Sequence, residues 1–371
     1  MGSWRLDNDL QQMLRQSAQG YLSEAGGAKH FRNVRASADG FDAQAWARMG
    51  ELGWTGILLP EAMGGSGLGL RPALTLAEEL GQSLSPEPFV ASAVIAGTLL
   101  AKSTAALGSE LALALAAGRR SVTLAWQERS GQIGRPAFQT KISGGRLSGR
   151  KMHVPCWHAG AALLVAAAGD KGPVVLLVDP RASGVTVVTR RVTDGTLEAE
   201  IDFADVAVFD DAMILQGEAV AAALDLALAR GTTSLCAGLE GLSSKLWRLT
   251  ADYIKQRVQF EQPLADYQAL RHRMVDLYSA IELASASWRK AASVLEARET
   301  GGLAVHAAKA RCSDTALTMG RWAIQYHGAF GYADEADVGL YVHTALRWSS
   351  WLGNAIAHRR KALAAHEQGK A

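Results

Sequence analysis

The stretch AALLVAAAGDKGPVVLLVDPRASGVTVVTR, residues 161–190, contains short apolar runs separated by the turn-forming segments GDKG and DPRASG. Short runs rich in Val, Leu and Thr between such turns are typical of β-strands. Further runs of the same kind flank the stretch, namely SVTLAW (121–126), RLSGRKMHV (146–154) and LEAEIDF (197–203). No segment of useful helical length lies between them, which argues against a Rossmann unit. The middle of the chain is therefore predicted to be an antiparallel β-sandwich or barrel.

The segments on either side of this β region show helical spacing of apolar residues. Before it, Leu10, Leu14 and Ala18 share one helix face. From residue 216 onward the only proline is Pro263, and a chain with so few prolines can hold long helices. Apolar spacing predicts helices over residues 224–246, 267–297, 303–326 and 340–365. Helices that are apolar on one side pack together, so a four-helix bundle is expected.

These patterns divide the chain into the three predicted domains of an α+β protein. An N-terminal helical domain covers residues 1–118, a β domain covers 119–215, and a C-terminal helical bundle covers 216–371. The chain has 371 residues, of which 49% are hydrophobic, and this is enough for a large buried core.

Composition argues against several classes of protein. The 38 basic and 36 acidic residues give a net charge of +2 without a basic patch, which is unlike a nucleic-acid binder. No uninterrupted apolar run reaches the ~18 residues of a membrane span, and the N-terminal residues are too polar for a signal peptide. A cytoplasmic protein with no metal, nucleic-acid or membrane partner is expected. The cysteines are too widely spaced for a disulfide framework or a metal site: Cys156, Cys236 and Cys312.

Two polar motifs in the C-terminal part could bind a ligand. The first is Arg257-x-Gln259-Phe260 followed by Gln268, and the second is QYHGAFGY, residues 325–332. Taken alone, these motifs also fit an exposed helix end and a helix-capping glycine. The glycines of the second motif could equally let the backbone approach a phosphate. The residues by themselves leave both interpretations open.

The arrangement of motifs along the chain resembles the FAD-dependent acyl-CoA dehydrogenase superfamily. LGWTGILLPEAMGGSGLGL (52–70) followed by LAEELG (76–81) is similar to the family's N-terminal pattern, and LSGRKMHV (147–154) is similar to a strand of its β domain. YIKQRVQFEQPLADYQALRHRMVDL (253–277) and QYHGAFGY (325–332) are similar to its C-terminal motifs. The matches follow the family's order along nearly the whole chain. The family's helical, β and helical domains agree with the division given above.

The resemblance implies a cofactor, a reaction and a set of binding residues. In this family FAD accepts a hydride from the β-carbon of an acyl-CoA while a carboxylate removes the α-proton. The planar, permanently charged guanidinium of Arg257 would suit a pyrophosphate. By resemblance, the residues that contact the FAD of a neighbouring subunit are Arg257, Gln259, Phe260, Gln268, Gln325 and Gly328. Those that lie beside the flavin are Trp126, Glu128 and His153.

The chain departs from the family at the catalytic carboxylate. In many members this base is a glutamate near the C-terminus, and the aligned residue here is Leu352. In others it lies one helix earlier, and the aligned residue is Gly231. Neither side chain can accept a proton, and the neighbouring acids Asp225 and Glu240 are about two helical turns away. No catalytic residue is therefore predicted. Glu261 also stands where the Arg-x-Gln-Phe motif has a glycine.

The leading hypothesis is a base-lacking subunit of a heteromeric acyl-CoA dehydrogenase of lipid metabolism, such as a heterotetramer that desaturates a steroid side chain or another bulky acyl-CoA. A partner chain would supply the glutamate, and an electron-transfer flavoprotein would accept the electrons. A homo-oligomer is the alternative assembly. The alternative functions are a flavin-dependent monooxygenase of the same fold and a structural, non-catalytic subunit.

Overall fold

The computed structural model describes residues 8–217, 219–333 and 335–367. Contacts within the chain form two compact units. The bundle unit comprises Met1–Phe31, Leu74–Ser85 and Thr232–Ala371, and the β unit comprises Arg32–Ala73 and Pro86–Gly231. Segments of the predicted N-terminal domain contribute to both units. The three-domain boundaries inferred from the sequence therefore stay a prediction. The helices whose residues are shared between the units are α2 (Ala28–Ala36), α4 (Leu70–Gln82) and α7 (Ala219–Gln256).

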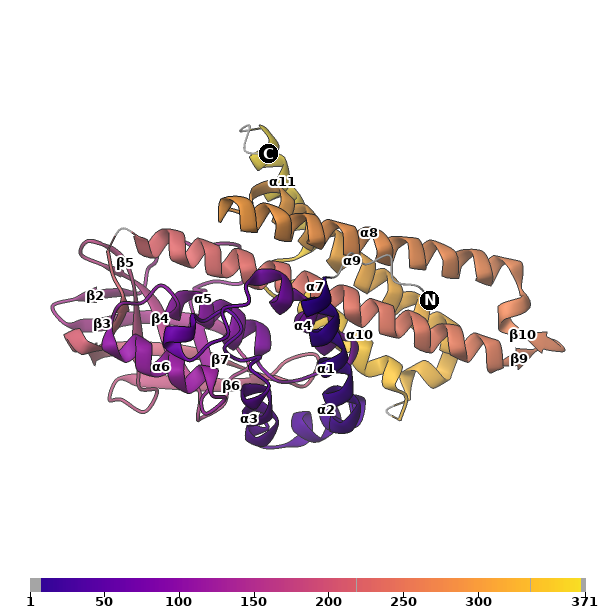
Figure 1. Cartoon of the computed structure of the whole chain (residues 1–371), viewed down its shortest axis with the longest axis horizontal. Helices are drawn as coiled ribbons and strands as arrows, with labels where there is room; N and C mark the ends of the chain where they lie inside the picture. The colour runs from indigo at the N-terminus through magenta and orange to yellow at the C-terminus, as the bar shows by residue number, and fades with distance from the viewer. Residues whose placement is uncertain (1–7, 218, 334, 368–371) are drawn as a thin grey trace. The chain divides into compact units, whose positions relative to one another are not determined.

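Within the described residues, the β unit is built on an eight-stranded sheet with the order β6-β7-β3-β2-β4-β5-β8, and β1 pairs with β4 (Figure 1). Most neighbouring strands are antiparallel, but β1 and β2 both pair with β4 in parallel. The sheet is therefore mixed rather than purely antiparallel. Its strands are β1 (Val122–Ala125), β2 (Lys141–Ser143), β3 (Arg146–Pro155), β4 (Ala162–Gly169), β5 (Gly172–Val178), β6 (Val185–Arg191), β7 (Leu197–Ala207) and β8 (Met213–Leu215).

Each apolar run that predicted a strand forms one, because alternate residues enter a shared core. Leu163 and Val165 of β4 pack in this core with Leu176 of β5 and with Ile201 and Phe203 of β7. The strands β2 and β8 were not predicted, since three residues are too few to show a period of two. Among the described residues, the α- and π-helices that lie wholly in this unit are α3 (Ala43–Glu51), the π-helical η2 (Phe89–Ala96), α5 (Gly97–Leu100) and α6 (Ala106–Ala116).

The bundle unit contains long helices, and α9 packs against α8, α10 and α11. The predicted helix over 340–365 is in fact two helices, since the chain leaves helical geometry between Ser350 and Ala355. Leu352 has φ +59° and Gly353 has φ +108°, and left-handed residues end a right-handed helix. The helices not yet bounded are α1 (Asp9–Ala25), α8 (Gln268–Arg298), α9 (Gly302–His327), α10 (Asp337–Ser350) and α11 (Ala355–Glu367).

Two buried side chains hold the break between α10 and α11. The Lys309 ammonium donates hydrogen bonds of 3.0 Å to the carbonyl oxygens of Trp348 and Ser349, where α10 ends. His358 Nε2 donates to the Leu352 carbonyl oxygen at 2.9 Å. Burial lowers the pKa of Lys309 to about 8. A cation at a helix C-terminus satisfies carbonyl groups that have no partner within the helix.

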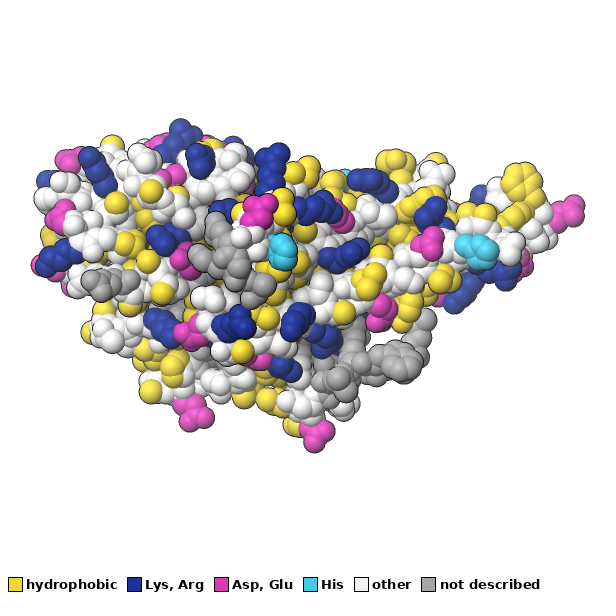
Figure 2. All heavy atoms as spheres, turned by 90° about the horizontal axis from the view of Figure 1, so that it is seen from above, with side chains coloured by type: hydrophobic (Ala, Val, Ile, Leu, Met, Phe, Trp, Pro, Cys, Tyr) yellow, Lys and Arg dark blue, Asp and Glu magenta, His cyan; other side chains and the backbone are white. Residues whose placement is uncertain are grey.

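The long helix α7 is the one described helix that is long and apolar enough, by length and composition, to cross a membrane. Its most apolar window is 67% buried inside the fold. Such burial is typical of a core helix. On the face drawn in Figure 2, basic side chains lie interspersed with acidic ones rather than gathered apart from them.

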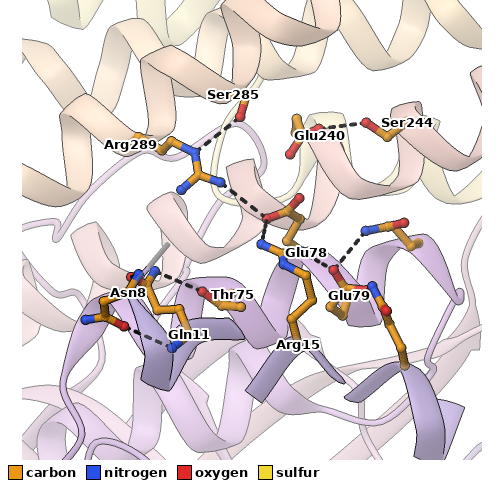
Figure 3. Close-up of polar contacts among 12 residues, drawn as sticks. Asn8, Gln11, Arg15, Thr75, Glu78, Glu79, Glu240, Ser244, Ser285 and Arg289 are labelled. Carbon is orange, nitrogen blue, oxygen red and sulfur yellow. Dashed lines mark hydrogen bonds and ion pairs between the residues drawn. The ribbon is translucent and has the colours of Figure 1, made fainter. Parts of the chain in front are cut away.

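A buried network of charged side chains joins α1, α4 and α8 in the bundle unit (Figure 3). Arg15 donates to Glu78 at 3.1 Å and also pairs with Glu79, which accepts from Gln19 at 3.1 Å. Arg289 approaches Glu78 at 3.8 Å. Burial raises the pKa of Glu79, and the positive charge of Arg15 opposes that rise. Removing one partner would leave a buried charge uncompensated, so this network ties the N-terminal helix to the bundle.

Candidate functional site

The first predicted motif forms a β-hairpin between α7 and α8 (Figure 1). Strand β9 (Val258–Gln259) pairs with β10 (Gln262–Pro263), and the two residues of the turn are Phe260 and Glu261. Both turn residues are left-handed, with φ +52° and +70°. Two consecutive left-handed residues are what a tight type I′ hairpin requires. The backbone is therefore strained at the tip of the hairpin, where the phenylalanine is presented.

The backbone of the hairpin is held while its side chains stay exposed. The Leu264 N–H donates to the Arg257 carbonyl oxygen at 2.8 Å, and the Tyr267 hydroxyl donates to the Gln259 carbonyl oxygen at 2.9 Å. The Phe260 side chain is 89% exposed. The Arg257 guanidinium is exposed and has no ion-pair partner among the residues that the structure describes. These side chains are thus available to another molecule.

The second predicted motif lies at the same end of the bundle unit. Tyr253, near the end of α7, stacks on His327 at the end of α9, with 4.2 Å between the ring centres. The Tyr326 hydroxyl donates to the Leu270 carbonyl oxygen at 3.0 Å, which joins α9 to the start of α8. Burial lowers the pKa of His327, and its Nδ1–H donates to the Ala323 carbonyl oxygen at 2.8 Å. His327 therefore packs the C-terminal end of α9 against Tyr253 of α7.

These contacts gather the predicted residues of the bundle unit onto one surface, which we call the hairpin surface. Gly328 has φ +59° and open space where a side chain would stand, so its backbone is approachable. In the adjoining η5 (Gly328–Tyr332), Tyr332 is 80% exposed. Figure 2 shows hydrophobic and basic side chains at this end of the unit. The hairpin surface consists of Arg257, Gln259, Phe260, Gln268, Gln325, Gly328, Phe330 and Tyr332, all exposed.

The chemistry of the hairpin surface fits a phosphorylated aromatic cofactor such as FAD. A guanidinium binds phosphate oxygens in a planar fork, the glutamine amides can donate and accept hydrogen bonds, and Phe260 offers a ring for stacking. A backbone without a side chain at Gly328 leaves room for a phosphate. The surface contains no group suited to removing a proton from carbon.

The residues predicted in the β unit are instead engaged within the chain. Trp126 is buried. The Glu128 carboxylate accepts from Lys151 Nζ at 2.7 Å and from the backbone N–H groups of Gln139 and Thr140 at 2.7 and 2.9 Å. Burial alone would raise the pKa of Glu128, but these hydrogen bonds outweigh it and lower the pKa. Burial lowers the pKa of Lys151 to about 8. The Glu128 carboxylate thus joins the loop after β1 to the residues that precede β2.

His153 is also engaged, in a way that the sequence did not indicate. It sits at a β-bulge of β3 with φ +53°. Its Nε2 lies 2.9 Å from Ser130 Oγ, and its Nδ1 lies 3.0 Å from Glu198 Oε1. These partners are far apart in the sequence, so no local pattern could have shown them. The placement of Trp126, Glu128 and His153 beside the flavin stays a prediction.

Neither predicted base position carries a carboxylate. Leu352 belongs to the bundle unit and is 4% exposed, and Gly231 lies within α7. The neighbouring acids have other roles. Asp225 pairs with Arg135 at 3.2 Å, and the buried Glu240 accepts from Ser244 Oγ at 2.7 Å. The carboxylates displaced along α7 are thus tied to their own neighbours.

Comparison with known proteins gives matches along most of the chain. Residues 8–119 match the family model for the acyl-CoA dehydrogenase N-terminal domain, and residues 216–364 match that for the acyl-CoA dehydrogenase C-terminal domain. The chain is 33% identical over 245 residues to acyl-CoA dehydrogenase FadE28 of Mycobacterium tuberculosis, an alignment that covers 64% of this chain and 69% of that protein.

Several solved structures share the fold. A variant of the steroid ACAD Tcur3481-Tcur3483 is 29% identical with a TM-score of 0.87, covering 97% of this chain and 98% of that one. A chain of the ChsE4-ChsE5 complex from Mycobacterium tuberculosis is 23% identical with a TM-score of 0.86, and the match covers 98% of each chain.

Proposed function

The chain belongs to the acyl-CoA dehydrogenase family, whose members are FAD-dependent oxidoreductases, and we propose that it is the base-lacking subunit of a heteromeric acyl-CoA dehydrogenase. In this proposal the hairpin surface binds part of an FAD that is held mainly by a second, different chain. That chain also supplies the glutamate that removes the α-proton. The subunit described here would then be required for flavin retention and not for proton transfer.

One contrast carries the proposal. The hairpin surface keeps the exposed side chains of Arg257 and Phe260, which have no ion-pair or hydrogen-bond partner among the described residues, whereas Leu352 and Gly231 occupy both base positions. A single chain that acted alone would need the carboxylate as well as the flavin contacts. A site built across a subunit interface needs only one half of its groups on each chain.

The substrate class is proposed from the relatives. Tcur3481-Tcur3483 is described as a steroid ACAD, and this chain is 29% identical to one of its chains. A steroid side chain or a similarly bulky acyl-CoA is therefore the proposed substrate of the assembly. The ChsE4-ChsE5 structure, which shares this fold, is a complex of two named chains and supports a second subunit as partner. An electron-transfer flavoprotein is the proposed acceptor.

Each exposed group has a proposed task. When bound, FAD supplies the hydride acceptor for oxidation at the β-carbon. Arg257 would pair with the pyrophosphate, because a guanidinium remains charged at every relevant pH. Phe260 would pack against a ring of the cofactor or of the partner. Gln268 and Gln325 would hydrogen-bond the cofactor, and the bare backbone at Gly328 would let a phosphate approach.

The test is to purify the chain alone and together with family members that carry glutamate at either base position. We expect flavin absorbance and acyl-CoA oxidation only in a mixed complex. Arg257→Ala should weaken FAD binding by about 10-fold or more, as expected for a lost charge-assisted hydrogen bond. Arg311→Ala is a matched control, because Arg311 is an exposed arginine on α9 away from the motif.

The alternatives give different results in the same experiment. Full FAD loading and acyl-CoA oxidation by the lone chain would contradict the subunit role. A product that requires oxygen and reduced flavin, with no enoyl-CoA, would indicate a monooxygenase of this fold. Unchanged flavin content in the Arg257→Ala complex would indicate a structural subunit.

A further inference from the structure

Three side chains of the β unit form a hydrogen-bonded chain that the proposed flavin role does not use. Ser130 follows β1 in an exposed loop, His153 sits on β3, and Glu198 is the second residue of β7. Ser130 Oγ lies 2.9 Å from His153 Nε2, and His153 Nδ1 lies 3.0 Å from Glu198 Oε1. A hydroxyl, an imidazole and a carboxylate in this order are the groups of a serine nucleophile with its base and its orienting acid.

The hydrogen-bond chemistry fixes the direction of the chain. An ionised carboxylate can only accept hydrogen bonds, so the proton of a neutral His153 must be on Nδ1, facing Glu198. Nε2 is then the unprotonated nitrogen and accepts from the Ser130 hydroxyl. This is the tautomer in which imidazole can remove the hydroxyl proton as a general base. Arg190 Nε donates to the same Glu198 oxygen at 3.0 Å and helps hold the carboxylate in place.

A second serine–histidine pair in the same unit shows the opposite arrangement. Ser121 Oγ lies 2.6 Å from His158 Nε2, but the Gly160 N–H donates to His158 Nδ1 at 3.2 Å. Nδ1 must therefore be unprotonated, and Nε2–H donates to the serine. In this tautomer the imidazole cannot accept the serine proton. The pair is also buried and stacked on Phe41, at 3.8 Å between ring centres.

Exposure and strain also distinguish the first group. Ser130 is exposed, the His153 side chain is 29% exposed, and the Glu198 side chain is buried. A substrate could therefore reach the hydroxyl while the carboxylate stays protected from water. His153 is held left-handed at a bulge, and strained non-glycine residues of this kind gather at functional sites. The next residue after Ser130 is Gly131, with φ +72° and open space beside it, which leaves its backbone accessible to a substrate oxygen.

We propose that Ser130, His153 and Glu198 form a nucleophilic site that cleaves acyl thioesters and activated carboxylic esters. Ser130 Oγ forms a bond to the acyl carbonyl carbon while its proton moves to His153 Nε2. The bond from carbonyl carbon to the leaving sulfur or oxygen breaks, and the leaving group takes the proton from His153. Water then attacks the acyl-serine, again through His153, and releases the carboxylic acid and free Ser130. Glu198 acts as a positioning residue, and the reaction is independent of flavin.

The test uses all 371 residues of the chain, purified alone. A fluorophosphonate probe should label one serine, and mass spectrometry should locate the added mass on the peptide that contains Ser130. Hydrolysis of 4-nitrophenyl acetate and of acetyl-CoA should follow the same residue. Ser130→Ala should abolish labelling and lower hydrolysis by about 10³-fold. Ser121→Ala should leave both unchanged, since its histidine holds the wrong tautomer.

The role of Glu198 is tested by comparing two variants. Glu198→Gln should slow labelling strongly, because an amide no longer fixes the Nδ1–H tautomer, and Glu198→Asp should retain part of the rate. Thermal melts of all variants show whether the sheet remains folded. Labelling of Ser130 no faster than that of Ser121 in folded protein would overturn the proposal. Equal hydrolysis by the parent chain and Ser130→Ala, or equal rates for the two Glu198 variants, would do so as well.

Discussion

At the scale of single residues, the hairpin turn contains a strained backbone conformation at Glu261. Glu261 has φ +70°, a conformation that costs a residue with a side chain about 1–2 kcal/mol relative to glycine. The resembled motif has glycine at this place. We expect Glu261→Gly to stabilise the bundle unit by about 1 kcal/mol once the greater flexibility of glycine in the unfolded chain is subtracted. Thermal melts would measure the change. Glu261→Ala, which keeps the strain, should show no comparable gain.

A second prediction concerns the residue at the usual base position. Leu352 is 4% exposed, and its backbone is fixed by His358. A carboxylate placed there would be buried without a hydrogen-bond or ion-pair partner provided for it, which would lower the free energy of unfolding by several kcal/mol. Leu352→Glu should therefore lower the melting temperature and should not confer acyl-CoA oxidation on the lone chain. Recovery of desaturation by this single change, followed as enoyl-CoA formation, would contradict the proposed division between subunits.

At the scale of elements, a histidine pair joins α9 to α11. His358 Nε2 donates to the Leu352 carbonyl oxygen, and a neutral His358 then accepts at Nδ1 from His306 Nδ1–H at 2.9 Å. Burial lowers the pKa of His306 to about 4 and that of His358 to about 3. Lys361 also disfavours protonation of His306.

This pair predicts a loss of stability in acid. Because the folded-state pKa lies below the ordinary value of 6.5, the unfolded chain binds protons more readily, and the free energy of unfolding falls as the pH drops from 6.5 toward 4. Each histidine should contribute a loss of roughly 2 kcal/mol between pH 7 and 5. Urea unfolding at both pH values would measure it. His306→Gln should reduce the pH dependence, and an unchanged slope would show that the pair titrates normally.

At the scale of the whole molecule, each unit carries its own buried ion network. The bundle unit has Arg15 with Glu78 and Glu79, and the β unit has Lys151 with Glu128. Removing one partner of a buried pair leaves the other charge uncompensated, which costs about 3–5 kcal/mol. Lys151→Met should therefore destabilise the β unit, by less than this amount because the Gln139 and Thr140 N–H groups still hydrogen-bond the Glu128 carboxylate.

The same variant separates folding from flavin binding. Because the Glu128 carboxylate is held by Lys151 within the chain, we expect the flavin content of the folded heteromeric complex to stay the same in Lys151→Met. Calorimetry and flavin absorbance on the same sample would check both parts. Arg150→Ala is the control, since Arg150 pairs with Glu200 at an exposed site and should change stability by less than about 1 kcal/mol. Loss of FAD without loss of fold would assign Glu128 a direct role.

Much of this architecture is encoded locally. The apolar runs between residues 121 and 203 predicted strands that are present, because alternate residues of each run enter the core. The scarcity of prolines after residue 216 predicted long helices, and Pro263 falls in the hairpin that ends the first of them. The exposed motif around Arg257 was also visible in the sequence, since a run of residue types along the chain needs no distant partner to be recognised.

Tertiary structure alone decided which polar side chains form hydrogen bonds within the chain and which remain exposed to other molecules. Glu128 is engaged by Lys151, and His153 by Ser130 and Glu198, all partners remote in sequence that only the bulged, mixed sheet brings within hydrogen-bond distance. The break at Leu352 likewise depends on His358, beyond it in the chain. The sequence by itself determined where strands and helices form, because their periodicity is local. Hydrogen-bond partners and buried charges were decided by the fold, because they depend on which distant side chains it places together.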